Sequence, residues 1–338
     1  MCSGLPAGAV RAASVLALVL AVAVTVSACA APTGFDAVST PDTGSTGGAV
    51  GRFAPYVDVT APRPRLADLA RATGDTTFVL AFVLAGDNSC DPRWDGQTPV
   101  GDAGLVSEVS ALRAQGGDVV VATGGADGPY LETACTSADA LARAYEKALD
   151  AVGSHHLDVD IEHSVPVDTM NRALLTVQRD RQVDITYTLP VANQTTGLSP
   201  DALNVLHSAA ALGVTATVNA MVMNFPYSGS WSDAMIAAAE ATAGQIRSVW
   251  PDKTPDQVYR ALGLTAMIGR NDVGMTTTTA DARALLGYAR SHSIGYLGFW
   301  AIARDNGTCP QEKVAANDCS GVTQSPYEFN GIFRGASS

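Results

Sequence analysis

Short apolar runs rich in strand-forming residues alternate along the chain with longer alanine-rich runs. The apolar runs predict eight strands, at Tyr56–Thr60, Thr77–Leu84, Asp118–Thr123, Leu157–Glu162, Asp184–Pro190, Thr217–Asn224, Ala261–Ile268 and Gly295–Trp300. The alanine-rich runs favour helices, for example Ala138–Val152, Pro200–Leu212, Ser232–Val249 and Ala280–His292. Eight strand–helix units over about 285 residues predict an α/β fold, the (β/α)8 TIM barrel. An open doubly wound sheet is the second choice, but the chain has no GxGxxG or GxxxxGK phosphate loop.

One predicted strand carries three acids on a single face. Side chains two apart in a strand share a face, so Asp158, Asp160 and Glu162 point one way while the apolar residues between them point the other. The apolar face fits a layer of helices, and the acidic face fits the open top of a barrel. Three carboxylates on one buried face are costly for structure alone, which makes this run the first candidate for chemistry.

Three interpretations of the acidic run remain open. An edge strand can carry charge on a solvated face. Clustered carboxylates beside His155, His156 and His163 could bind a divalent metal, although no spaced second ligand set occurs elsewhere in the chain. In the third interpretation, crowded like charges keep one carboxyl protonated at neutral pH for acid/base catalysis. We expect no metal and no cofactor.

The predicted strand ends are rich in polar and aromatic groups. In a barrel, function collects at the carboxyl ends of the strands, and an aromatic ring with convergent carboxylates and amides suits a sugar. The residues at those ends are Asp58, Gly124, Gly125, Asp160, Glu162, Tyr187, Met223, Asn224, Arg270, Asn271, Asp272 and Trp300.

The composition is that of a well-cored, acidic globular protein. Hydrophobic residues make up 47% of the chain and charged residues 16%. The formal net charge of -12 argues against a nucleic-acid partner, which requires a basic footprint. We expect a monomer.

The first 29 residues have the features of an export signal. Arg11 precedes an apolar run, Ala12 to Val26, that is shorter than the roughly 20 residues needed to span a bilayer. Residues 26–29, Val-Ser-Ala-Cys, resemble the bacterial lipobox, in which the cysteine is lipidated and becomes the mature N-terminus. We therefore predict a signal at 1–29 with Cys29 as membrane anchor, a flexible linker at 30–50 and the barrel at 51–338; the alternative is ordinary cleavage and free secretion.

Four cysteines remain outside the export segment, and they allow three pairings. In an oxidising compartment we favour Cys309 with Cys319, which share one loop, and Cys90 with Cys135, which lie on two neighbouring loops. A zinc site is disfavoured because no CxxC or HxxxH spacing occurs.

Several of these segments resemble motifs of glycoside hydrolase family 18, the chitinase family. Residues 155–162 read His-His-Leu-Asp-Val-Asp-Ile-Glu, similar to the family's Asp-x-x-Asp-x-Asp-x-Glu. Residues 121–125 resemble its Ser-x-Gly-Gly motif, and residues 219–224 its bacterial and archaeal Met-x-Met-Asp segment. Residues 265–272 and 299–306 resemble the last two strand ends of that branch, so the resemblance extends from about Tyr56 to Arg334.

The resemblance implies substrate-assisted hydrolysis of β-1,4-linked N-acetylglucosamine with retention of configuration. It makes Glu162 the acid/base, Asp160 the acceptor for the acetamide N–H, and Asp158 a group that shares a proton with Asp160. Trp300 would form the floor under the sugar. The other candidate binding residues are Asn224, Met223, Tyr187, Asp272, Asn271, Gly124 and Gly125, with Trp94 and Trp231 as candidate extensions of the cleft.

Two departures from the family pattern keep alternatives open. His155 replaces the first acid of the motif, and Asn224 stands where the branch has Asp, after Met223 where the wider family has Tyr. Tyr187 or Tyr227 could supply the missing hydroxyl. The alternatives are a chitinase-like lectin that binds without cutting, and an enzyme that acts on peptidoglycan or N-glycan cores.

Overall fold

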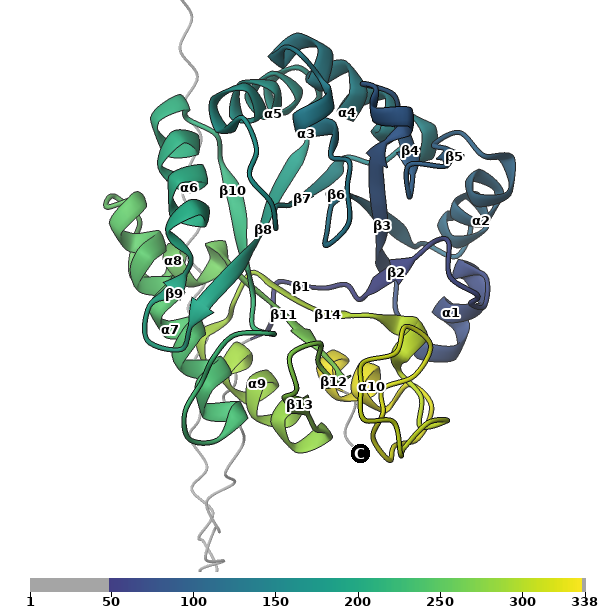
Figure 1. Ribbon diagram of the computed structural model, residues 1–338, viewed down its shortest axis with the longest axis vertical. Helices are drawn as coiled ribbons and strands as arrows, with labels where there is room; N and C mark the ends of the chain where they lie inside the picture. Colours follow the sequence, from purple (N-terminus) through teal and green to yellow (C-terminus); the bar gives the residue numbers. More distant parts are fainter. Residues whose placement is uncertain (1–48, 336–338) are drawn as a thin grey trace, which may run out of the picture. The chain divides into compact units, whose positions relative to one another are not determined.

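The computed structural model describes residues 49–335, and parallel strands form a ring within them (Figure 1). The neighbours around the ring are in sequence order, with every adjacent pair parallel. The eight strands are β2 (Tyr56–Asp58), β3 (Thr77–Ala85), β6 (Asp118–Gly124), β7 (His156–Asp160), β8 (Asp184–Asn193), β10 (Ala216–Met221), β11 (Leu262–Met267) and β14 (Tyr296–Trp300). The predicted TIM barrel is therefore confirmed.

The ring closes through one short segment, residues 52–58. Its first part, β1 (Arg52–Phe53), pairs with β14, and its second part, β2, pairs with β3. Pro55 lies between the two parts, where its lack of an N–H interrupts the ladder but its carbonyl still accepts from the Val79 amide at 3.0 Å. The first strand thus has a neighbour on each side, and the barrel has no open edge there.

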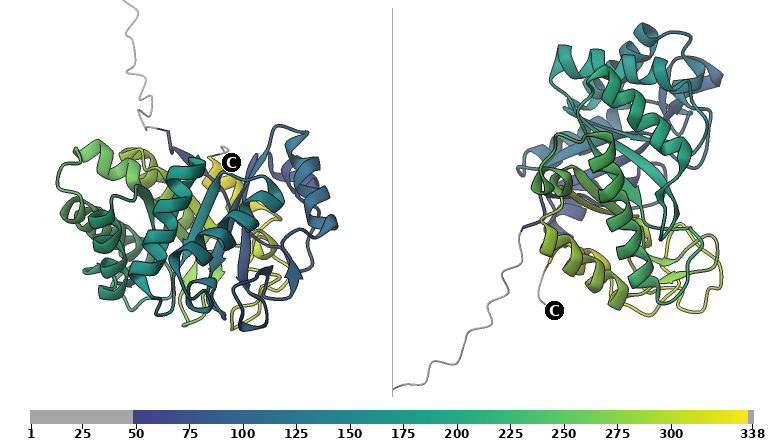
Figure 2. Two further views of the ribbon diagram at one scale, coloured as in Figure 1. Left: turned by 90° about the horizontal axis from the view of Figure 1, so that it is seen from above. Right: turned by 90° about the vertical axis from the view of Figure 1, so that its left-hand side faces the viewer.

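Helices surround the barrel on its outer side (Figures 1 and 2). They are α1 (Leu66–Thr73), α2 (Ala103–Arg113), α3 (Leu131–Ala134), α4 (Ala138–Val152), α5 (Val167–Arg181), α6 (Pro200–Leu212), α7 (Trp231–Val249), α8 (Pro255–Ala261), α9 (Thr279–His292) and α10 (Glu328–Arg334). Local sequence sets their ends: Ser137 caps α4 by accepting from the Ala140 amide, and Gly153 ends it in the left-handed conformation.

Small elements decorate the ends of the barrel strands. A hairpin, β4 (Pro92–Trp94) and β5 (Thr98–Pro99), extends the sheet beyond β3. The strand β9 (Gly197–Leu198) pairs with β8, and β12 (Gly269–Arg270) pairs with β13 (Thr276–Thr277). Two 3-10 turns, η1 (Gly86–Asn88) and η2 (Ile302–Arg304), complete the set. These pieces build the loops around the mouth of the barrel.

Side-chain alternation divides the interior into two cores. Leu157 and Val159 point outward into the large apolar layer between strands and helices, where both are fully buried. A smaller apolar group, which includes Tyr56 and Tyr296, fills the inside of the barrel. Asp158 and Asp160 lie on this inner face, with 2% and 4% of their surface exposed, so the predicted division of the acidic run is confirmed.

Several strands are shorter than the sequence pattern predicts, and in two of them the difference leaves a candidate site residue outside the strand. β7 ends at Asp160, so Glu162 lies beyond the strand, and β10 ends at Met221, so Asn224 lies in the loop that follows. Asn224 has a φ of 55°, a left-handed conformation that asparagine tolerates better than most residues and that a regular strand excludes.

Both favoured disulfides are present. Cys90 pairs with Cys135 and Cys309 with Cys319, with Cα–Cα distances of 4.6 and 6.0 Å. The predicted signal at 1–29, its Cys29 anchor and almost all of the linker at 30–50 lie outside the described residues. Within residues 49–335, no helix combines the length and apolar character needed to cross a bilayer.

Candidate active site

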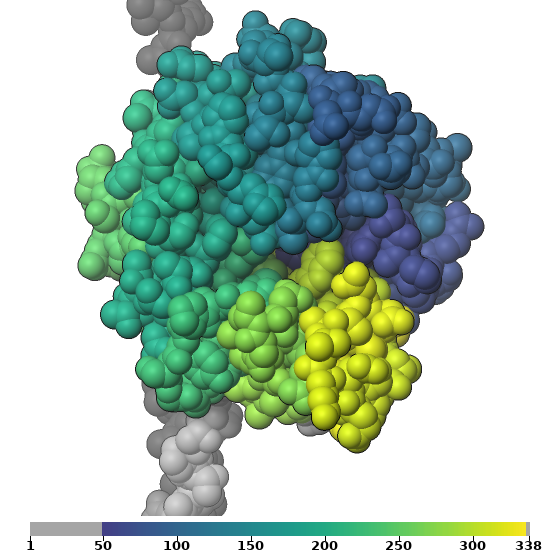
Figure 3. Space-filling view, in the orientation of Figure 1, coloured from purple at the N-terminus to yellow at the C-terminus, as the bar shows by residue number. Residues whose placement is uncertain are grey.

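The carboxyl ends of the strands surround a cavity of about 520 Å³. Figure 3 shows this hollow near the centre of the face, between the purple N-terminal segment and the yellow C-terminal segment. The lining residues used below are Tyr56, Asp58, Thr60, Phe82, Asp95, Gly124, Asp127, Asp160, Glu162, Thr188, Met223, Asn224, Thr265, Asp272, Trp300 and Asn317. A polar floor with aromatic walls is the arrangement that a sugar requires.

Asp158 lies deepest of the three acids and is held by two hydroxyl donors. Tyr56 donates from its phenol at 2.6 Å, and Thr188 donates at 2.6 Å. Burial raises the pKa of Asp158 to about 6, although both hydroxyls lower it. Each oxygen of this carboxyl therefore accepts one hydroxyl, which fixes the orientation of the group.

Asp160 lies above Asp158 and lines the cavity. Burial raises its pKa well above the ordinary value, and the charges of Glu162 and Asp158 raise it further. Its Oδ1 atom is buried and has no hydrogen-bond partner within the described part of the chain. A buried acceptor without a partner is costly, so a ligand that donates a hydrogen bond at this position would be stabilised.

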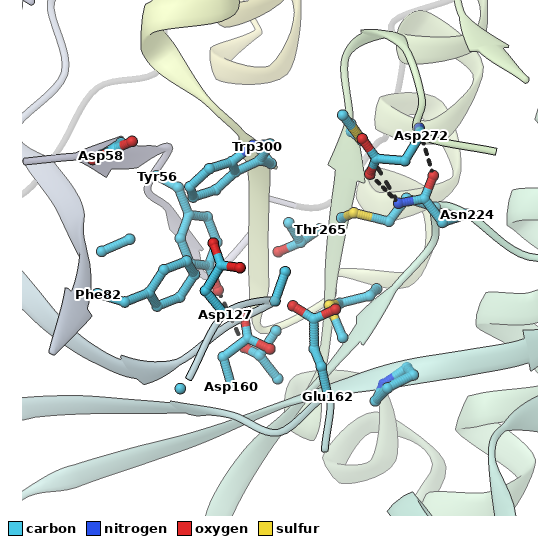
Figure 4. A pocket seen from close by; sticks show the side chains of 18 of the residues that line it. Tyr56, Asp58, Phe82, Asp127, Asp160, Glu162, Asn224, Thr265, Asp272 and Trp300 are labelled. Carbon is cyan, nitrogen blue, oxygen red and sulfur yellow. Dashed lines mark hydrogen bonds between the residues drawn. The ribbon is translucent and has the colours of Figure 1, made fainter. Parts of the chain in front are cut away.

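Glu162 follows the strand and faces the same space as Asp160 (Figure 4). Its side chain reaches solvent, whereas its backbone N–H donates to the Tyr130 hydroxyl at 3.2 Å. Loss of hydration in the cavity raises the pKa of Glu162, His163 lowers it, and Asp272 and Asp127 raise it. The net rise favours a carboxylic acid that still carries its proton at pH values where an ordinary glutamate has lost it.

A hydroxyl and amide network supports the acids from the neighbouring strands. Asn219 of β10 donates to Thr188 at 2.9 Å and to Thr265 at 2.8 Å. Thr188 in turn donates to Asp158. Three strands are therefore linked under the acidic run, which fixes the position of Asp158.

Aromatic rings form one wall of the cavity. Trp300 and Phe82 stack with ring centroids 5.6 Å apart and an interplanar angle of 15°, and Tyr56 lies 6.1 Å from Trp300. Figure 4 shows these rings together on one side of the pocket. Such a wall offers a sugar ring a flat apolar surface beside the carboxyl groups.

Asn224 and Asp272 form a reciprocal pair on another side of the cavity. The Asn224 amide nitrogen donates to the Asp272 carboxylate at 2.7 Å, and the Asp272 backbone N–H donates to the Asn224 oxygen at 3.0 Å. The pair joins the loops after β10 and β11 (Figure 4). Both residues line the cavity, as does Met223.

The two glycines at the end of β6 permit close approach of backbones. A Cβ on Gly124 would lie 1.8 Å from the Asp160 carbonyl oxygen, and one on Gly125 would lie 2.7 Å from the Phe82 ring. The Gly125 N–H donates to that carbonyl at 3.0 Å. Gly124 lines the cavity, and both glycines set the position of the acidic strand end.

Several sequence candidates do not line the cavity, among them Tyr187, Asn271, Gly125, Trp94, Trp231 and Tyr227. Tyr187 is fully buried and donates to Asn171 at 2.6 Å because strand alternation turns it outward, opposite to Thr188. Asn271 is also buried and donates to the Met267 and Gly269 carbonyls, so it organises its own loop. Trp94 and Trp231 are buried in the outer core, where their indole N–H groups donate to Val100 and Thr277.

Sequence reasoning missed several residues that the structure brings to the site, among them Tyr56, Phe82, Asp95 and Asp127. Tyr56 and Phe82 lie on the first two barrel strands, and Asp127 lies in the loop after β6. Strand alternation could have predicted Tyr56, because it places the Tyr56 side chain on the inner face of the barrel. Phe82 and Asp127 carried none, because their roles depend on how separate loops meet. Tyr227, a candidate for the missing hydroxyl, is 42% exposed and contacts Trp231 instead.

Comparison with known proteins finds two curated relatives. The chain is 33% identical over 308 residues to the Escherichia coli K12 protein named probable bifunctional chitinase/lysozyme, covering 83% of this chain and 34% of the relative. It is 33% identical over 278 residues to endochitinase 11 of Metarhizium anisopliae, covering 75% of this chain and 52% of the relative. The chain thus spans about a third and about half of the lengths of these relatives. No protein-family model matches it.

A solved structure covers most of both chains. It contains catalytic site mutants of active domain 2 of the thermostable chitinase from Pyrococcus furiosus, complexed with chito-oligosaccharides. The identity is 32% and the TM-score 0.78, and the match covers 86% of this chain and 95% of the other. The similarity therefore extends over most of both chains.

Proposed function

Because the chain belongs to glycoside hydrolase family 18, we propose that it hydrolyses β-1,4 linkages between N-acetylglucosamine residues, as in chitin or chito-oligosaccharides. One observation carries the proposal: Asp160 and Glu162 line the cavity, and Asp158 lies directly beneath them on the same strand face. The chitinase names of the relatives support the same substrate class.

The three acids suit a mechanism in which the substrate supplies the nucleophile. The oxygen of the 2-acetamido group attacks the anomeric carbon while the bond to the leaving oxygen breaks and Glu162 gives that oxygen its proton. An oxazolinium ion results. Water then adds to the anomeric carbon, returns a proton to the Glu162 carboxylate and restores the acetamide, with configuration retained.

The raised pKa of Glu162 suits the acid step. Its ordinary value is 4.5, and desolvation in the cavity raises it. Glu162 must start protonated, so activity should persist above the ordinary pKa and fall as the pH rises through the raised value.

Asp160 would bind the acetamide group, and Asp158 would exchange a proton with Asp160. The unpartnered Oδ1 of Asp160 is placed to accept the acetamide N–H, which turns the amide oxygen toward the anomeric carbon. A negative charge on Asp160 would stabilise the oxazolinium. Asp158, with a pKa of about 6, is the group beneath that can hold the proton Asp160 loses.

A second substrate class is favoured by the name of one relative. The Escherichia coli protein is called a chitinase/lysozyme, so peptidoglycan is a candidate substrate for the same acids. The lectin alternative is less well supported, because binding alone has no need for an acid at Glu162, and this residue reaches the cavity.

The decisive experiment is hydrolysis of a fluorogenic N-acetylglucosamine oligomer by the full-length chain and by Glu162→Gln. We expect the variant to lose about 1,000-fold or more in kcat, since general acid catalysis contributes about 100- to 10,000-fold, and to retain binding of the oligomer. The matched control is Glu146→Gln, which alters a residue of the outer helix α4. Equal turnover in the wild type and Glu162→Gln would disprove the proposed role.

We also propose export and lipid anchoring through Cys29, the cysteine of the lipobox-like segment. The chain should partition with membranes when expressed in a bacterium, and Cys29→Ser should release it to the soluble extracellular or periplasmic fraction. Equal distribution of the two proteins would remove the anchor from the proposal and leave secretion.

A further inference from the structure

The cavity carries an excess of negative charge that the three acids of β7 do not explain. No lysine, arginine or histidine is among the described residues that line it. Six carboxyl groups do line it, those of Asp58, Asp95, Asp127, Asp160, Glu162 and Asp272. A glycan of neutral sugars requires no such charge. The substrate-assisted mechanism therefore does not account for the excess negative charge of the cavity walls.

Three of these acids form a separate group, which we call the acidic wall: Asp58, Asp95 and Asp127. Asp58 is the last residue of β2, whereas Asp95 and Asp127 lie in the loops after β4 and β6. The Oδ1 atom of Asp58 accepts from Thr60 and Ala61 and so has a fixed direction. Partial burial raises the pKa of Asp95, and the charges of Asp58 and Asp127 raise it further, so the three groups lie in one electrostatic field.

Two cations close to the loop that carries Asp95 already have partners. Arg93, two residues before Asp95, pairs with Asp91 at 3.0 Å and donates to the Gln97 carbonyl at 3.1 Å. Lys147 pairs with the same Asp91 at 2.6 Å. Within residues 49–335 the acidic wall has no ion-pair partner, so a bound cation would relieve its mutual repulsion.

A second observation points to a hydrogen-bond-donating ligand in the same cavity. Asp160 has only 4% of its surface exposed, lines the cavity, and has an oxygen without a partner. In the part of the chain that the structure describes, no three His, Cys, Asp or Glu side chains converge closely enough to hold a metal ion. The described carboxyl groups of the cavity are therefore not arranged to bind one metal ion together.

We propose that the acidic wall binds the ammonium group of an unacetylated glucosamine residue, so that the preferred substrate is a partly deacetylated chitin. The proposal rests on the proposed function and specifies its substrate. An N-acetylglucosamine must still occupy the position beside Asp160 and Glu162, because its acetamide supplies the nucleophile. A glucosamine elsewhere along the cavity places its three N–H donors against the carboxylates of the wall.

The same charge disfavours anionic glycans. The stem peptides of peptidoglycan carry carboxylates, and these would approach a cavity that is lined by six acids and, among the described residues, by no basic side chain. Like charges brought together in a partly desolvated site repel strongly. The acidic wall therefore selects among the polymers that share the N-acetylglucosamine linkage.

The test compares two soluble substrates of equal length with the full-length protein, a fully acetylated oligomer and a partly deacetylated one. The ratio of their kcat/KM values is measured for the wild type, for the triple variant Asp58→Asn/Asp95→Asn/Asp127→Asn, and for the single variant Asp127→Asn. We expect a ratio in favour of the deacetylated oligomer, reduced about 10-fold in the triple variant, equivalent to about 1.4 kcal/mol. High salt should reduce the wild-type preference, because screening weakens the attraction.

An exposed acid far from β2, β4 and β6 in the chain supplies the control variant. Asp252→Asn alters an exposed acid between α7 and α8 and should keep the wild-type ratio. A wild-type ratio of one or less, or a ratio unchanged in the triple variant, would overturn the acidic wall as a glucosamine site. The Asp127 carboxylate has no protein partner among the described residues, so the single variant should fold even if the triple variant does not.

Binding separates failure of this proposal from failure of the hydrolase. The Glu162→Gln protein is titrated calorimetrically with a glucosamine hexamer and with an N-acetylglucosamine hexamer. Binding of the glucosamine hexamer that the triple substitution weakens supports the acidic wall even if the wild type cleaves neither substrate. No binding of the glucosamine hexamer contradicts it even if chitin is hydrolysed.

Discussion

Asn224 and Asp272 hold each other by two hydrogen bonds of 2.7 and 3.0 Å across the loops after β10 and β11. The amide is the donor in one bond and the acceptor in the other, so an aspartate at 224 would keep the acceptor but lose the donor. It would also place a second carboxylate against Asp272. Asn224, which stands where the family branch has aspartate, therefore has in Asp272 a partner that uses both the donor and the acceptor of its amide.

We predict that Asn224→Asp lowers kcat/KM about 10-fold, because two facing carboxylates repel and the loops separate. The check is steady-state kinetics on an N-acetylglucosamine oligomer. The double variant Asn224→Asp/Asp272→Asn restores a donor–acceptor pair and should recover part of the loss. A single variant that is faster than wild type would show instead that Asn224 limits the reaction.

Tyr56 and Asp158 are joined by a 2.6 Å hydrogen bond although they lie 102 residues apart. Tyr56→Phe removes the donor, and since that bond lowers the pKa of Asp158, the pKa should rise further. We expect kcat to fall about 10- to 100-fold, in line with the roughly 1.5–3 kcal/mol of a hydrogen bond to a charged group, together with a shifted pH–rate profile. Tyr187→Phe is the control, because the Tyr187 hydroxyl faces away from the cavity and donates to Asn171. An identical pH profile in Tyr56→Phe would argue against proton exchange at Asp158.

The buried charge of Asp158 should make stability depend on pH. Its folded pKa of about 6 lies above the ordinary 3.8, so the folded state holds the proton more tightly than the unfolded chain does. This contribution is fully present below about pH 4 and is lost as pH rises through 6. Asp158→Asn cannot ionise, so chemical denaturation should show it gaining up to about 3 kcal/mol on the wild type between pH 4 and 8. A constant difference between the two proteins across that range would refute the assignment.

The stacked pair of Trp300 and Phe82 should contribute to binding more than to chemistry. Trp300→Leu removes the flat surface and the contact at 5.6 Å, so we expect KM to rise about 10-fold, with a smaller effect on kcat. Trp231→Phe, which changes a tryptophan of the outer core, is the comparison. If Trp300→Leu lowers only kcat, the ring acts on the transition state instead of the bound sugar.

The two disulfides should differ in their contribution to stability because they close loops of different length. Loop-closure entropy predicts about 4 kcal/mol for Cys90–Cys135, which are 45 residues apart, and about 3 kcal/mol for Cys309–Cys319, which are 10 apart. Urea unfolding of the two Cys→Ser double variants measures the difference. The second disulfide also closes the loop that brings Asn317 to the cavity, so its loss should raise KM, whereas loss of the first should not.

Local sequence predicted the regular elements closely. The helices α4 and α6 begin and end at the predicted residues, because their caps and C-terminal glycines act within a few positions. Strand alternation also placed Asp158 and Asp160 on the inner face. It was less reliable at strand ends, where Glu162 and Asn224 follow the last paired residue, since pairing depends on the neighbouring strand.

The order of the eight barrel strands, the helices α4 and α6 and the run of acids in β7 could be read from the amino-acid sequence. These properties follow from side-chain periodicity and from capping between residues near in the chain. Only the tertiary structure decided that Tyr187 and Asn271 leave the cavity while Phe82 and Asp127 enter it. The physical reason is that hydrogen bonds and stacking between distant loops set these positions, and no local pattern records which loops will meet.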